Sequence, residues 1–143
     1  MRLWLNGPSS SFSDTVFDNN GYQLNWNSDR TLTWQVNKAP SGNVTVSSGA
    51  VPNDGGWHRV VCYLSVSNSI GIILDNGTAA TASFTGGMYN AGTDFLEFLT
   101  TPGSPNPTLL VDEVAFWHDF VFSDPAALTK DWNGGSGVTY PLP

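Results

Sequence analysis

Acidic side chains on predicted strands are the residues of this chain whose type and spacing could best support chemistry. Strand alternation places positions i and i+2 on one face, about 6.5 Å apart along the strand. Retaining glycoside hydrolysis needs two carboxyl groups about 5–5.5 Å apart. Asp94 and Glu97 are three residues apart, and Asp112 and Glu113 are adjacent, so each pair points to opposite faces. The spacing predicts a protein that is not an enzyme.

Other reactive residues are few and scattered. His58 falls on one predicted strand and His118 directly follows another, and the chain has no cluster of Cys and His residues at metal-ligand spacing. The single cysteine, Cys62, lies in the apolar phase of a strand and cannot form an intramolecular disulfide. No serine-centred nucleophile elbow or phosphate-binding glycine loop is present. We therefore interpret His58 and Cys62 as structural residues.

A predicted hairpin over residues 22–36 has two unlike faces. Aromatic and aliphatic side chains alternate along it with amide and hydroxyl side chains. The aromatic and aliphatic set is Tyr22, Leu24, Trp26, Leu32, Trp34 and Val36. The amide and hydroxyl set is Gln23, Asn25, Asn27, Thr31, Thr33 and Gln35. Because they share the phase of the aliphatic residues, Trp26 and Trp34 are predicted to be core residues and not sugar platforms. The amide and hydroxyl face is either a solvated surface or a binding surface.

The stretch 57–84 predicts a three-stranded meander. Strands are expected over residues 57–66, 70–74 and 79–84, and Asp75-Asn76-Gly77 is typical of a tight turn. Its predicted core residues are Trp57, Val60, Cys62, Leu64, Ile72 and Leu74. Further strands are expected over 2–6, 15–17, 43–48, 94–100 and 108–117, and Ser123 or Asp124 caps a short helix that ends before 133–135. Together these elements predict an all-β antiparallel β-sandwich with one short C-terminal helix.

The composition of the chain limits the classes of partner that it is expected to bind. The 143 residues suit a single domain over 1–143. Five basic residues against twelve acidic ones give a net charge of -7, which argues against nucleic acid and anionic membranes as partners. No apolar run approaches the roughly 20 residues that cross a bilayer, so we expect no membrane insertion. The first residues lack the apolar region of a signal peptide, and we expect none in this chain.

The order of several motifs resembles a known family. The run Gly56-Trp57-His58-Arg59-Val60 precedes a hairpin that ends in Leu74-Asp75-Asn76-Gly77. Residues 110–117 (LVDEVAFW) follow, and then Phe122-Ser123-Asp124 and Leu128. This pattern, which covers roughly residues 53–137, is similar to the laminin G-like domains of the concanavalin A-like lectin/glucanase superfamily. The resemblance implies a jelly-roll sandwich and leaves the activity open.

The resemblance carries two further expectations. Family members normally have a strand before the one that residues 2–6 resemble, so this first strand is expected to be missing, replaced or supplied by another chain. The resulting N-terminal edge, or Phe12 and Phe17 beside it, is expected to contact another protein subunit. Many laminin G-like domains also bind calcium at a rim of the sandwich. Asp18, Asp75 and Asp112 are the candidate ligands here, and no other cofactor is expected.

Two functions remain open from the sequence. The first is a non-catalytic recognition module that binds glycans or a cell surface, within a larger assembly. Its candidate glycan-binding residues, all in predicted loops, are Asn19, Asn20, Tyr89 and Asn90. The alternative is a structural virion protein, such as a capsid decoration or tail-fibre subunit of a phage. Either function places the chain outside the cell or on a virion surface.

Overall fold

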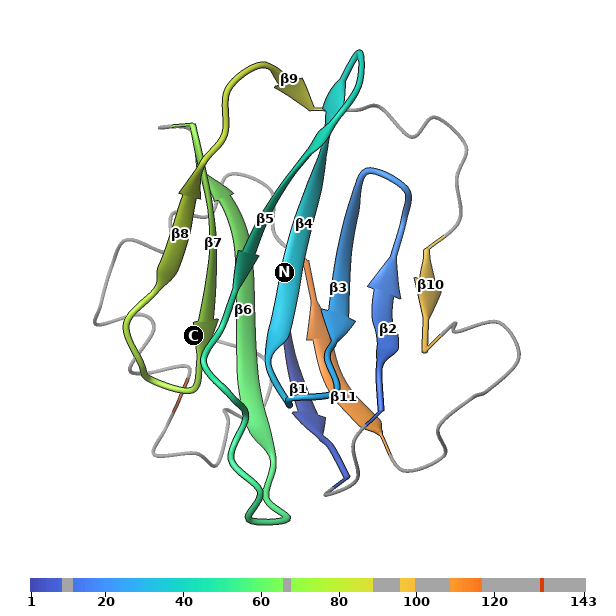
Figure 1. The fold of residues 1–143 in the computed structure, drawn as a ribbon. Coiled ribbons are helices and arrows are strands. Elements are labelled where there is room, and N and C mark those ends of the chain that lie inside the picture. The colour runs from blue at the N-terminus through green and yellow to red at the C-terminus, as the bar shows by residue number, and fades with distance from the viewer. Residues whose placement is uncertain (9–11, 66–67, 89–95, 100–108, 117–131, 133–143) are drawn as a thin grey trace.

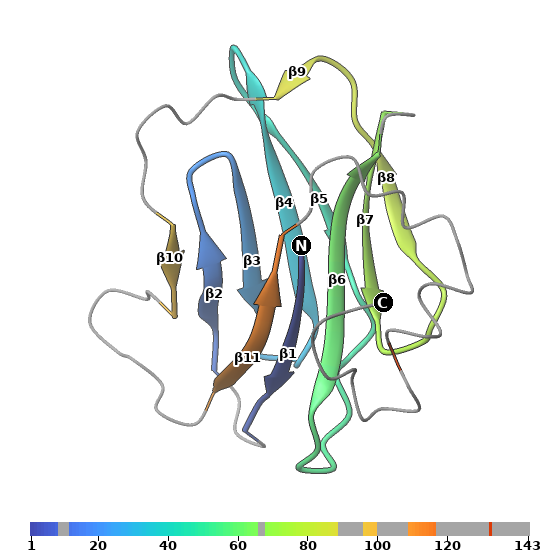
Figure 2. The same ribbon diagram turned by 180° about the vertical axis from the view of Figure 1, so that it is seen from behind.

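The chain folds into two antiparallel β-sheets that pack face to face (Figure 1; Figure 2 shows the opposite side). The computed structural model describes residues 1–8, 12–65, 68–88, 96–99, 109–116 and 132. The strands are β1 (Arg2–Asn6), β2 (Asp14–Asp18), β3 (Tyr22–Trp26), β4 (Leu32–Ala39), β5 (Asn43–Ser47), β6 (His58–Ser65), β7 (Ser69–Leu74), β8 (Ala80–Ser83), β9 (Gly87–Met88), β10 (Glu97–Phe98) and β11 (Leu110–Ala115). The predicted all-β antiparallel sandwich is confirmed.

The first sheet has the strand order β11-β1-β6-β7-β8. It contains the predicted meander, in which β6 pairs with β7 and β7 pairs with β8. The Asp75-Asn76-Gly77 turn closes the β7 end, and the Gly77 amide donates to the Leu74 carbonyl at 3.0 Å. Alternation and turn chemistry therefore predicted this part of the sheet correctly.

The second sheet has the order β10-β2-β3-β4-β5, and β9 pairs with the far end of β4. The predicted hairpin is β3–β4, in which Leu24 pairs with Trp34 and Asn25 with Thr33. The β2–β3 pairing shifts register between Thr15 and Phe17. This β-bulge turns both Val16 and Phe17 into the interior, where each is fully buried.

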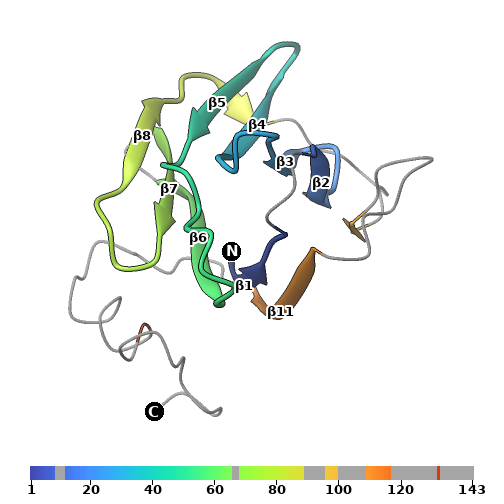
Figure 3. The same cartoon turned by 60° about the horizontal axis from the view of Figure 1, so that its bottom comes forward.

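The two sheets face each other (Figure 3). The hydrophobic core is built from residues of both sheets. Trp26 is fully buried and Trp34 is 4% exposed, which confirms both as core residues. Val60, Cys62 and Ile72 are buried as predicted, and Leu74 is half-buried against the core.

Two of the predicted core residues are wrong. Trp57 and Leu64 are each 41% exposed. Trp57 precedes the first residue of β6 and belongs to the preceding loop, where alternation no longer fixes the direction of a side chain. Leu64 is the penultimate residue of β6, near the end of the strand. Alternation therefore overestimates burial where a strand begins and ends.

The outer face of the first sheet is also buried. Arg2 and Arg59 are fully buried, and Trp4 is 5% exposed. Trp132 stacks on Trp4, with ring centroids 5.6 Å apart, and the Arg59 guanidinium lies 5.4 Å from the Trp132 ring centroid. The Trp132 ring thus covers the Arg59 guanidinium, and the first five residues of β6 are buried on both faces of the sheet.

The expected open N-terminal edge is wrong. β1 pairs with β6 on one side and with β11 on the other, so its backbone groups face neighbouring strands within the same chain. Phe17 is fully buried, and Phe12 stacks on Trp26 with ring centroids 5.9 Å apart. Residues 110–115 therefore cover the edge of β1 that was expected to be open.

The helix predicted over 123–132 lies outside the described residues, apart from Trp132. Within the described part of the chain, no helix has the length and apolar character needed to cross a membrane.

Candidate functional site

The outward face of the second sheet carries amides and hydroxyls in register. Across its strands Thr15, Asn25, Thr33 and Ser47 form one row, and Asp18, Gln23, Gln35 and Thr45 form a second. These side chains are half-buried or exposed. In the alternate phase of β3 and β4, the buried core residues are Leu24, Trp26, Leu32, Trp34 and Val36. We call this surface the polar face. It contains the amide and hydroxyl set of the predicted hairpin.

A chain of hydrogen bonds fixes the first part of the polar face. The Thr15 hydroxyl donates to Asn25 Oδ1 at 3.1 Å, and Asn25 Nδ2 donates to Gln23 Oε1 at 3.0 Å. Gln23 Nε2 then donates to Asp18 Oδ2 at 2.8 Å. Each amide has two N–H groups, so Asn25 and Gln23 each keep one that is not used among the described residues. The side chains are therefore oriented in advance and still able to donate.

A second group of hydrogen bonds lies beside the first. Asn27 Nδ2 donates to the hydroxyls of Thr31 and Thr33, both at 2.9 Å. The Thr33 hydroxyl is also 3.1 Å from the Ser47 hydroxyl. Because both N–H groups of Asn27 are used, its Oδ1 is oriented as an acceptor.

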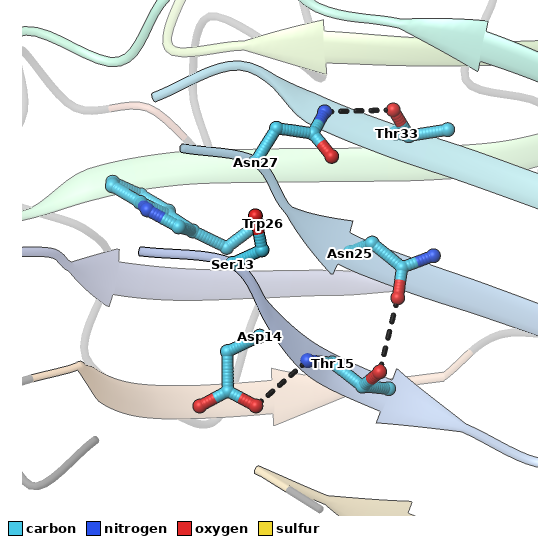
Figure 4. A pocket seen from close by; sticks show the side chains of 7 residues that line it. All are labelled: Ser13, Asp14, Thr15, Asn25, Trp26, Asn27 and Thr33. Atoms are coloured by element: carbon cyan, nitrogen blue, oxygen red, sulfur yellow. Dashed lines mark hydrogen bonds between the residues drawn. The ribbon is translucent and has the colours of Figure 1, made fainter. Parts of the chain in front are cut away.

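A shallow depression of about 400 Å³ lies between the two groups. It is lined by Ser13, Asp14, Thr15, Asn25, Trp26, Asn27 and Thr33. Figure 4 shows Thr15 and Asn25 joined on one side and Asn27 and Thr33 joined on the other. Its polar side chains come from β2, β3 and β4, from Ser13 directly before β2 and from Asn27 directly after β3.

Packing beneath the depression holds this end of the sheet in place. The Arg30 side chain donates to the carbonyls of Pro8, Val51 and Pro52 and lies over the Trp26 ring, 5.3 Å from its centroid. Gly7 touches the same ring so closely that a Cβ there would collide with it. Three loops that are distant in sequence are thereby tied to Trp26.

Strand pairing brings together two carboxylates that the sequence did not connect. Glu97 of β10 pairs directly with Asp18 of β2, so both side chains lie on the polar face. Both Asp18 oxygens already accept hydrogen bonds, Oδ1 from the Asn20 amide at 2.7 Å and Oδ2 from Gln23. No sequence signal predicted this neighbour, because the two residues are far apart in the chain.

A family model described as the concanavalin A-like lectin/glucanases superfamily matches residues 1–124. The chain belongs to this superfamily. The resemblance drawn from the motifs is thereby confirmed. No curated protein matches the chain in sequence.

Solved structures of toxin binding domains share this concanavalin A-like fold. The binding domain of Paraclostridial Mosquitocidal Protein 1 superposes with a TM-score of 0.73 at 10% identity, over 94% of this chain and 36% of that one. The botulinum neurotoxin serotype D binding domain gives 0.58 at 9% identity, over 77% and 30%. The binding domain of Botulinum Neurotoxin DC in complex with SialylT gives 0.51 at 13% identity, over 62% and 24%. The chain thus spans about a third or less of each, and these likenesses show the fold alone.

The four predicted glycan-binding residues divide into two pairs. Asn19 and Asn20 form the β2–β3 turn, where Asn19 Oδ1 accepts hydrogen bonds from the amides of Gly21 and Tyr22, at 3.1 and 2.9 Å. The side-chain oxygen of Asn19 therefore shapes the turn. Tyr89 and Asn90 lie outside the described residues.

The three predicted calcium ligands lie on separate elements. Asp18 ends β2 in the second sheet, while Asp75 follows β7 and Asp112 lies in β11 of the first sheet. Asp75 Oδ2 is 3.0 Å from His58 Nδ1, and Asp54 Oδ1 is 3.1 Å from His58 Nε2. Among the described residues no group of three or more His, Cys, Asp or Glu side chains is arranged to hold a metal ion. Asp75 therefore contacts His58, the residue interpreted as structural.

Proposed function

We propose that this domain is a non-catalytic recognition module that binds a glycan on its polar face. One observation carries the proposal: the hydrogen-bond chain from Thr15 through Asn25 to Gln23 holds side-chain amides in fixed orientations beside an open depression. Pre-oriented groups lose little conformational entropy when a ligand binds. Sugars present many hydroxyls, each a donor and an acceptor, and these match such a surface.

The polar face offers both kinds of hydrogen-bonding group. Asn25 and Gln23 each keep an N–H that can donate to a sugar oxygen, and Asn27 Oδ1 can accept from a sugar hydroxyl. The rows formed by β2, β3, β4 and β5 extend this pattern beyond the depression. An elongated oligosaccharide could therefore contact several strands at once.

The comparisons are consistent with the proposal at the level of fold. The similar structures are binding domains of toxins, and one of them was solved in complex with SialylT. A module of this kind would act outside the cell or on an exposed surface.

Two alternatives have less support. Hydrolysis would need a suitably spaced pair of carboxyl groups, and the pairing of Asp18 with Glu97 is the candidate that the second sheet provides. An open N-terminal edge would favour the structural virion subunit, but β1 is paired on both sides. The glycan-binding module remains the better interpretation.

A glycan array with matched variants tests the proposal. Wild-type protein is expected to bind a set of oligosaccharides, and Asn25→Ala is expected to lose most of that signal. The control is Asn76→Ala, the same change at an exposed turn residue of the first sheet. Tyr89→Ala separates the polar face from the loop site predicted by the sequence. Signal that depends on Tyr89 but not on Asn25 would move the site to that loop.

A separate assay addresses catalysis. Incubation with β-glucans and galactans is expected to release no reducing ends. Turnover that is abolished by Asp18→Asn or Glu97→Gln would instead identify the paired carboxylates as catalytic and overturn the non-catalytic assignment.

A further inference from the structure

Carboxylates border the polar face. Asp18 and Glu97 pair at one edge of the sheet, and Asp14 lines the depression. Asp29 lies at the β3–β4 turn, where its Oδ1 accepts a hydrogen bond from the Thr31 hydroxyl at 2.7 Å. Carboxyl side chains therefore surround the amides and hydroxyls, and those of Asp29 and Glu97 are exposed.

Two of the five basic side chains belong to the other sheet. Arg2 and Arg59 are fully buried in β1 and β6, and Arg59 packs on Trp132. Both strands lie in the first sheet, across the core from the polar face. Neither guanidinium is therefore available to a ligand on the polar face.

Two more basic side chains contact groups other than the amides and hydroxyls of the polar face. The Arg30 guanidinium donates to three backbone carbonyls and covers Trp26. Lys38 lies in the core phase of β4, opposite to the phase of Thr33 and Gln35, and its side chain lies beside Gly86. The fifth, Lys130, lies outside the described residues. Among the described residues no Arg or Lys side chain thus contacts the amides and hydroxyls of the polar face, although Arg30 covers the Trp26 ring that lines the depression.

This distribution of charge bears on the class of glycan. Proteins bind carboxylates mainly through Arg or Lys, and like charges brought together oppose binding. A sialic or uronic acid on the polar face would approach Asp18 and Glu97 without a basic partner among the described residues. Resting on the function proposed above, we infer that the polar face selects neutral oligosaccharides and rejects those that end in sialic or uronic acid.

Matched pairs of glycans provide the test. N-acetyllactosamine is compared with its 3′-sialylated form, and xylo-oligosaccharides are compared with the same chains bearing glucuronic acid. At low salt each neutral member should bind at least about tenfold more tightly than its acidic partner. Raising the salt concentration should narrow the difference, because salt screens the repulsion. The double variant Asp18→Asn/Glu97→Gln should narrow it too, whereas Asp112→Asn, an exposed carboxylate in the first sheet, should not.

The outcomes separate this inference from the proposed function. Acidic glycans that bind as tightly as their neutral partners would overturn the inference and leave glycan binding intact. A preference for neutral glycans that responds neither to salt nor to the double variant would also overturn it, because charge would not be the cause. Absence of binding to every glycan would overturn the proposed function and the inference together.

Discussion

Thr15 and Asn25 face each other across β2 and β3, and the Thr15 hydroxyl donates to Asn25 Oδ1 at 3.1 Å. The hydrogen-bond chain continues from Asn25 to Asp18, although Thr15 and Asp18 are three residues apart on one strand and would alternate to opposite faces. The β-bulge at Val16 removes that conflict, because it turns two successive side chains inward. A local irregularity of β2 thus assembles the polar face.

Two aliphatic residues of the first sheet are expected to respond differently to truncation. Ile72→Ala should lower the free energy of unfolding by about 2–5 kcal/mol, because Ile72 is buried in the core. Leu64→Ala should cost less than about 1 kcal/mol, because Leu64 is 41% exposed. Denaturant unfolding of both variants measures the contrast. Equal losses would show that Leu64 packs in the core after all.

Gly7 is expected to tolerate no side chain. A Cβ there would collide with the Trp26 ring, so Gly7→Ala should destabilise the fold by about 1–3 kcal/mol. Gly49→Ala is the matched control, since a Cβ at Gly49 meets no atom within 4 Å. Thermal unfolding compares the two variants. If Gly7→Ala and Gly49→Ala had the same melting temperature, Gly7 would not lie against the Trp26 ring.

The Cys62 thiol is expected to be unreactive in the folded protein. Burial raises its pKa to about 12, so almost no thiolate forms near pH 8. A chromogenic disulfide reagent should label the folded protein very slowly and label one thiol per chain after denaturation. Rapid labelling under native conditions would place Cys62 outside the core.

Asp54 is expected to make the stability of the fold depend on pH in the acid range. A hydrogen bond from the Gly56 amide, followed by the His58 contact, lowers the pKa of Asp54 below its ordinary 3.8. The group therefore stabilises the fold above that value, and its contribution is lost as the pH falls through the lower pKa of the folded state. Between about pH 5 and about pH 3, the wild-type melting temperature should fall further than that of Asp54→Asn. Identical pH profiles would rule out this contribution.

Local sequence patterns predicted which side chains of a strand face the core and which face outward. Alternation identified Trp26 and Trp34 as core residues, and it placed Asn25 and Thr33 on the opposite, polar side. These features depend on neighbours within a single strand or hairpin, where sequence distance and spatial distance agree. The turn at Asn76-Gly77 was predicted correctly for the same reason.

The sequence did not predict which strands pair when they are far apart in the chain. Alternation does not say which strands are neighbours, so neither the β1–β11 pairing nor the contact of Glu97 with Asp18 was predicted. Burial of Arg59 was missed because it involves Trp132, which is distant in the chain. The sequence pattern predicted the amides and hydroxyls of the polar face. The β-bulge in β2 and the pairing of Asp18 with Glu97 could be seen only in the folded structure.

The central claim is that the polar face binds a glycan, and nuclear magnetic resonance of the side-chain amides tests it most directly. The protein is titrated with the neutral oligosaccharide that gives the strongest array signal. The amide resonances of Gln23, Asn25 and Asn27 should shift together and saturate, while that of Asn76 stays in place. Saturable binding that leaves all three polar-face amides unmoved would contradict the claim.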